Sequence, residues 1–197
     1  MSKGRLEAFS DGVIAILITI MVLELRVPHD PTWNALRELA PKLGAYALSF
    51  VFLGIYWNNH HHMFHATRQI TGGVLWANLH LLFWLSLIPF ATAWMGENHN
   101  APVPTSAYGI VMMLAGIAYY ILERTIIAGE GPDSTLAEAV GQETKGIVSV
   151  VLYGLAIPLA FVHQGISDAI YVLVALMWLV PDRRIEGTLR RTEQHRV

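Results

Sequence analysis

A single carboxylate interrupts the first apolar segment of this chain. Residues 12–23 contain no Asp, Glu, Lys or Arg, but they are too few to cross a bilayer, which takes about 20 residues. The segment reaches that length only when Phe9, Ser10 and Asp11 are included. An ionisable side chain at membrane depth is costly and normally faces a partner or water. Ser10 and Asp11 could simply cap a helix at the interface. We favour a buried polar hub that docks the first helix on its neighbours.

Amide and imidazole side chains gather in the next two apolar segments. Residues 57–65 read WNNHHHMFH, and His61 and His65 share one helical face because they are four residues apart. Such groups can hydrogen-bond between helices, and a pH-sensitive contact is an alternative because histidine titrates near neutrality. A metal site is disfavoured, since no intramembrane Glu and no second histidine box accompany the cluster. The candidate partners on these two segments are Asn58, His61, His62, Asn78 and His80.

The composition excludes a soluble globular enzyme. Of the 197 residues, 54% are hydrophobic and 14% charged, against roughly 25% charged in ordinary soluble domains. The mean hydropathy is +0.44. A net charge of −2 gives no reason to expect nucleic acid as a partner. The absence of cysteine excludes disulfides, thiolate metal sites and thiol catalysis. We therefore predict an integral membrane protein.

The apolar segments predict an all-α protein in which residues 1–197 form one domain with six transmembrane helices. The expected spans are 6–27, 42–66, 70–95, 102–124, 143–163 and 166–181. An even number of spans places both termini on one side. With the N-terminus inside, ten of the 13 Lys and Arg residues fall on interior segments and three on exterior ones. The positive-inside rule then makes both termini cytoplasmic.

The first helix carries an aliphatic stripe. Ile16, Ile20 and Leu23 lie at positions i, i+4 and i+7, and Thr19 is about 60° away at 100° per residue. Asp11 is about 140° from Ile16, so it points away from whatever the stripe faces. Such a stripe is usually oriented toward lipid or the bundle, and its spacing alone does not indicate a pore.

Residues 5–11 resemble the signature of one family of membrane proteins. The sequence is Arg, three variable residues and then Phe-Ser-Asp, which is similar to transmembrane protein 175 and its bacterial relatives. The continuation GVIAILITIMVLEL, the WNNHHHMF segment and residues 79–93 also look like that family. The resemblance covers most of the chain.

The resemblance implies a potassium-permeable channel in a bacterial cytoplasmic (inner) membrane. A single six-helix unit looks like the bacterial type, a homotetramer whose first helices line one central pore. By offset from the motif, the constriction would consist of Ile16, Ile20 and Leu23, with Thr19 supplying a ring of hydroxyls. The expected interhelical polar network behind the pore wall consists of Arg5, Phe9, Ser10 and Asp11 together with the Asn and His candidates above. We expect no cofactor, no metal other than permeating K⁺, and no catalysis.

The chain contains no TVGYG-like segment, so a carbonyl filter of the usual potassium-channel kind is not expected. A hydrophobic constriction can instead gate by dewetting. The alternative is a proton-coupled secondary transporter that uses Asp11 and the His60–His65 cluster as a relay. It would call for a midplane substrate site between repeats, and no repeat is evident. A membrane metalloenzyme built on the histidines ranks third.

Overall fold

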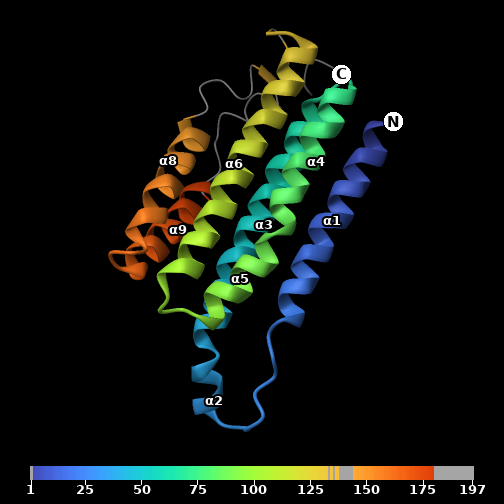
Figure 1. Ribbon diagram of the computed structural model, residues 1–197. Helices are drawn as coiled ribbons and strands as arrows, with labels where there is room; N and C mark the ends of the chain where they lie inside the picture. Colours follow the sequence, from blue (N-terminus) through green and yellow to red (C-terminus); the bar gives the residue numbers. More distant parts are fainter. Residues whose placement is uncertain (1, 133, 135, 138–143, 180–197) are drawn as a thin grey trace.

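The computed structural model describes residues 2–132, 134, 136–137 and 144–179, and these residues form helices and connections without strands. The predicted all-α class is confirmed. The helices, shown in Figure 1, are α1 (Lys3–Leu23), α2 (Trp33–Glu38), α3 (Ala40–Ala66), α4 (Gly72–Ser86), α5 (Ile88–Glu97), α6 (Pro102–Glu130), α8 (Thr144–Leu159) and α9 (Gln164–Leu179).

The long helices lie side by side in one elongated bundle. Helix α1 forms one edge, and α8 and α9 form the opposite edge, with α3, α4, α5 and α6 between them (Figure 1). Helix α1 packs on α3, α4 and α5. The short helix α2 extends beyond the end of the bundle (Figure 1). One side of α1 is therefore covered by three helices, and none of the other described helices covers the opposite side.

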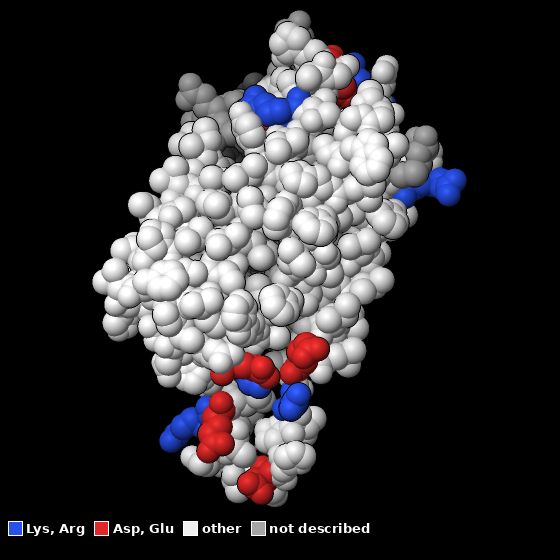
Figure 2. Space-filling model, in the orientation of Figure 1, with Lys and Arg blue, Asp and Glu red and all other residues white. Residues whose placement is uncertain are grey.

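Charged side chains on the face drawn in Figure 2 are confined to the two ends, and the wide belt between them is uncharged. Three stretches are long and apolar enough to cross a membrane, namely Lys3–Leu23, Gly72–Glu97 and Pro102–Glu130. Helices α8 and α9 are apolar but shorter, at 16 residues each. These features indicate a multi-pass membrane protein, and the count of six spans stays a prediction.

Several helix boundaries differ from the expected spans. Helix α1 ends at Leu23 rather than at residue 27, ahead of the prolines at 28 and 31. The third expected span is divided at Leu87 into α4 and α5, because Pro89 in the first turn of α5 has no N–H to continue the ladder. Residues 143, 180 and 181 of the last two spans lie outside the described part, as do five of the ten interior basic residues.

Local side chains explain where two helices begin. Thr71 precedes α4, and its hydroxyl accepts a hydrogen bond from the Val74 amide at 3.3 Å. Thr32 does the same for α2 by accepting from the Ala35 amide. Each hydroxyl satisfies one of the amides that a first helical turn leaves unpaired.

A tyrosine cluster joins α6 to α9. The rings of Tyr108 and Tyr171 have centroids 5.2 Å apart, and the Tyr171 hydroxyl donates to the Thr105 carbonyl at 2.9 Å. Tyr171 reaches that carbonyl across Gly109, where a Cβ atom would overlap the Tyr171 hydroxyl and lie 3.2 Å from Ile157. The absence of a side chain at residue 109 therefore sets the distance between these helices.

Replacing Gly109 with Ala is expected to lower the melting temperature of the detergent-solubilised protein. The overlap should cost about 1–3 kcal/mol, as overpacked cores do. Gly116→Ala on the same helix is the control, because its Cβ would meet Val150 at an ordinary 3.5 Å. Both variants gain the same helix propensity, so equal melting temperatures would contradict this account of the α6–α9 contact.

Candidate functional site

Helix α1 has one buried face and one uncovered face. The buried face consists of Leu6, Ser10, Ile14, Leu17 and Met21. On the uncovered face, the exposed fractions are 59% for Ile16, 41% for Ile20 and 76% for Leu23. The three residues predicted to form a constriction thus all lie on the side of α1 that the other described helices leave open.

Thr19 lies on the same uncovered face. Its hydroxyl donates to the carbonyl of Ala15, one turn earlier, at 2.9 Å. A hydroxyl has one proton and two acceptor lone pairs, so this bond uses the proton and leaves the oxygen to accept. Thr19 therefore presents an acceptor, the group that suits a cation, beside the aliphatic side chains of Ile16, Ile20 and Leu23.

Behind the uncovered face, three side chains link α1, α4 and α3 through buried hydrogen bonds. The Asn78 amide donates to the Ser10 hydroxyl oxygen at 3.0 Å, and the Asn78 carbonyl oxygen lies 2.8 Å from His60 Nε2. All three side chains are at most 1% exposed. Since the Asn78 oxygen can only accept, His60 must donate from Nε2. The Ser10 hydroxyl donates to the Leu6 carbonyl at 3.0 Å, so its partners are also complete.

Asp11 is held beside this network. Its Oδ1 accepts a hydrogen bond of 3.0 Å from the indole N–H of Trp57 on α3. Trp57 is 46% exposed and Asp11 is half-buried. The carboxylate is therefore directed toward the flank of α3, and the fully buried member of the Phe-Ser-Asp sequence is Ser10.

The other predicted network residues occupy the surface of the single chain. Arg5 and Phe9 lie on the uncovered side of α1, and Phe9 is 51% exposed. His80 accepts from Trp84 on its own helix at 3.0 Å. The remaining three, Asn58, His61 and His62, are exposed on α3. Of the predicted set, the structure thus brings Ser10, Asp11 and Asn78 into hydrogen bonds with neighbouring helices.

His60 and Trp57 were not among the predicted network residues. His60 lies seven residues after buried Leu53 and four before buried Phe64, so it belongs to the inward stripe of α3. Its ring contacts that of Phe64 with centroids 4.6 Å apart. This periodicity was a usable signal for His60. For Trp57 the only signal was an indole N–H in need of an acceptor.

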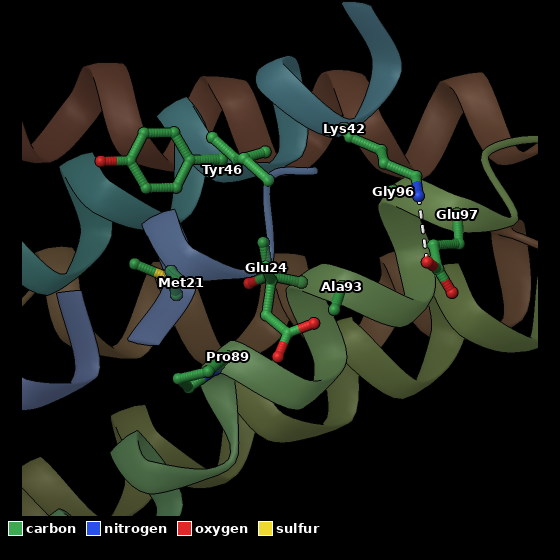
Figure 3. Close-up of a pocket in the computed structure, with 10 residues that line it drawn as sticks. Met21, Glu24, Lys42, Tyr46, Pro89, Ala93, Gly96 and Glu97 are labelled. Carbon is green, nitrogen blue, oxygen red and sulfur yellow. Dashed lines mark hydrogen bonds and ion pairs between the residues drawn. The ribbon is translucent and has the colours of Figure 1, made fainter. Parts of the chain in front are cut away.

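The C-terminal end of α1 lies beside a cavity between α3 and α5, shown in Figure 3. Met21 and Glu24 line it from the end of α1, and Pro89 lines it from α5. Lys42 of α3 and Glu97 of α5 form an ion pair at 3.0 Å at its margin (Figure 3). Across the described residues, no group of three or more His, Cys, Asp or Glu is arranged to hold a metal ion.

Comparisons with known proteins agree on one family. Residues 5–89 match the family described as endosomal/lysosomal potassium channel TMEM175. A potassium channel of Chryseobacterium sp. (strain P1-3) is 53% identical over 190 residues, 96% of this chain and 99% of that protein. The crystal structure of a lysosomal potassium-selective channel TMEM175 homolog from Chamaesiphon minutus has a TM-score of 0.80 at 27% identity, covering 90% of this chain and 96% of that one. The endosomal/lysosomal proton channel TMEM175 of Gallus gallus is 30% identical over 146 residues, 66% of this chain and 29% of that protein.

Substituting Asn78 with Leu is expected to destabilise the protein. The change leaves a buried imidazole N–H without an acceptor and removes the donor to Ser10, and each buried unpaired group costs about 1–3 kcal/mol. Thermal unfolding in detergent measures the loss. The control is Asn59→Leu, because the Asn59 amide donates within its own helix, to the Ile55 carbonyl at 2.9 Å. A melting temperature for Asn78→Leu at or above that of the control would show that the network does not stabilise the bundle.

Proposed function

The chain belongs to the TMEM175 family of channels, and we propose that it forms a potassium-permeable cation channel with no catalytic activity. The names of its bacterial relatives support potassium as the permeant ion. The single observation that carries the pore assignment is the two-faced character of α1. Apolar packing and a few polar contacts hold one side of the helix against the bundle, and the opposite side offers an uncovered aliphatic stripe.

In the proposed assembly, four copies meet around one axis with the uncovered face of α1 turned inward. Helix α1 suits this place because it forms an edge of the bundle (Figure 1). Ile16, Ile20 and Leu23 then form stacked aliphatic rings, and Thr19 adds a ring of hydroxyl oxygens between them. Arg5 and Phe9, exposed in the single chain, would lie near the contacts between copies. Both termini would be cytoplasmic in a bacterial inner membrane.

The proposed constriction works by excluding water. A narrow ring of aliphatic side chains dewets, and an ion that has lost its water meets no compensating ligand there, so the closed ring stops conduction. A modest displacement of α1 readmits water and a hydrated ion. Without a carbonyl cage, discrimination between K⁺ and Na⁺ would depend on the Thr19 oxygens and the pore diameter. We therefore expect weaker selectivity than in channels with a carbonyl filter.

The positions of Asp11 and the histidines argue against a proton-coupled transporter. Asp11 and His60 each have a partner in the protein, Trp57 and Asn78 respectively. His61 and His65 lie on the exposed side of α3, with rings 6.3 Å apart, away from the inward stripe that carries His60. The family names also describe channels rather than carriers. Asp11 accordingly has a supporting role in the proposed pore wall.

Replacing Ile16 with Asn is expected to raise K⁺ flux into liposomes at least several-fold, because an amide in the constriction keeps it wet. Ile147→Asn on α8 is a matched control, since Ile147 is also 59% exposed but lies on the opposite edge of the bundle. Flux is measured in K⁺ and in Na⁺ at equal protein loading. Wild-type flux in a correctly assembled Ile16→Asn protein would rule out pore lining by this face.

The complex is expected to have a protein mass of about 88 kDa, four times the 21.9-kDa chain. More than one copy is required because one copy of α1 cannot enclose a conduction path, and the family resemblance implies four. Native mass spectrometry after detergent removal gives the number of copies directly. A monomer, with flux intact, would refute the central pore.

A further inference from the structure

The N-terminal end of α1 is attached to the C-terminal end of α3 by one ammonium group. Lys3 Nζ donates to the carbonyl of His65 at 3.1 Å and to the carbonyl of Thr67 at 2.9 Å. These carbonyls lie where α3 ends at Ala66, so no amide of a following helical turn pairs with them. The negative end of the helix dipole adds to the attraction. A single side chain thus supplies two of the bonds that the end of α3 lacks.

The turn that receives Lys3 is itself held from the other side. Glu130, the last residue of α6, uses Oε1 to accept from the amides of Arg68 and Gln69, the latter at 3.1 Å. Thr67 is 2% exposed and donates its hydroxyl proton to the Met63 carbonyl at 2.8 Å. The turn between α3 and α4 therefore meets an ammonium on its carbonyl side and a carboxylate on its amide side. It is a fixed anchor point for Lys3.

The two ends of α1 are held by different kinds of contact. Among the described residues, the side-chain hydrogen bonds from α1 to other helices come from Lys3, Ser10 and Asp11, and the Asn78 and Trp57 partners lie on α4 and α3. Beyond Asp11, the helix contacts the bundle through apolar side chains. Its last turn lies beside the cavity of Figure 3. Directional bonds thus hold the N-terminal half, and apolar packing through Ile14, Leu17 and Met21 holds the half that carries the constriction.

We infer that Lys3 is a positioning residue for the pore helix: it fixes the N-terminal end of α1 on the α3–α4 turn and so restrains the constriction from opening. This inference rests on the proposed function. Movement of the Ile16–Leu23 part is then a pivot about an anchored end. Without Lys3 the first turns of α1 lose their anchor, and the bonds of Ser10 and Asp11 are left to hold the helix against outward displacement. Neither Lys3 nor Glu130 contacts the conduction path in this arrangement, so both act through the placement of α1.

Lys3→Met is expected to raise basal K⁺ flux several-fold, and Lys3→Arg is expected to restore the wild-type value because guanidinium N–H groups can reach the same carbonyls. Glu130→Gln should act in the same direction with a smaller effect, since an amide oxygen is a weaker acceptor than a carboxylate. Lys42→Met is the matched control: it also removes one ammonium, but the Lys42–Glu97 pair joins α3 to α5. Flux in Lys3→Met equal to that in Lys42→Met would overturn the inference, as would a failure of Lys3→Arg to rescue.

A spectroscopic readout separates positioning from general stability. The chain has no cysteine, so one introduced cysteine takes a single spin label. With Ser2→Cys, the distance distribution between copies should broaden in Lys3→Met and stay narrow in Lys42→Met and Lys3→Arg. An unchanged distribution in Lys3→Met would refute the anchor even if the flux rose.

Failure of this inference can be told apart from failure of the pore proposal. If Ile16→Asn raises flux and Lys3→Met does not, pore lining by α1 is supported and the positioning role of Lys3 is refuted. If Ile16→Asn has no effect in assembled protein, α1 does not line the pore. A broadened label distribution in Lys3→Met would then still show that Lys3 positions α1.

Discussion

The arrangement of this protein depends on one constraint: polar side chains placed at membrane depth must find protein partners, because lipid offers none. The Asn78 amide on α4 can lie buried among apolar segments because its N–H meets the Ser10 oxygen on α1 and its carbonyl oxygen meets His60 on α3. The three side chains come from three helices, so satisfying them fixes the rotation of α1 about its own axis. Once that rotation is fixed, the aliphatic stripe has only one direction in which to face.

A functional surface can therefore be specified by what lies behind it. The uncovered face of α1 carries mainly aliphatic side chains, which pack in many registers and by themselves define no orientation. The bonds of Lys3, Ser10 and Asp11 are directional and supply the missing definition. The polar anchors therefore lie away from the aliphatic stripe, as the proposed dewetting constriction requires. This arrangement also explains why a carboxylate next to a proposed cation pathway can point toward α3.

The sequence was informative wherever length and periodicity decide the outcome. The long apolar segments predicted an all-helical membrane protein, and the stripe at Ile16, Ile20 and Leu23 was visible from spacing alone. Prediction was weaker for hydrogen-bond partners, because several side chains of one type could bind the same partner. Four histidines between residues 60 and 65 could each have met Asn78, and only the packing of α3 selects His60. The hydrogen bonds of the Trp57 indole and the Lys3 ammonium were not predicted because their acceptors are distant in the chain. The direction of the open face toward other copies rests on the family resemblance, since no property of one isolated helix specifies it.

The break at Leu87 has a consequence for how this protein is made. At 1.5 Å per residue, α4 and α5 are about 22 and 15 Å long, and each is shorter than the roughly 30-Å hydrocarbon layer. Neither could be integrated alone by the insertion machinery, so the 26 residues must enter the bilayer as one hydrophobic unit and bend afterwards. The energetics of insertion and the final bent shape are thereby set by separate features of the same stretch. Insertion depends on the total hydrophobicity of the stretch, whereas its bend in the folded bundle comes from Pro89.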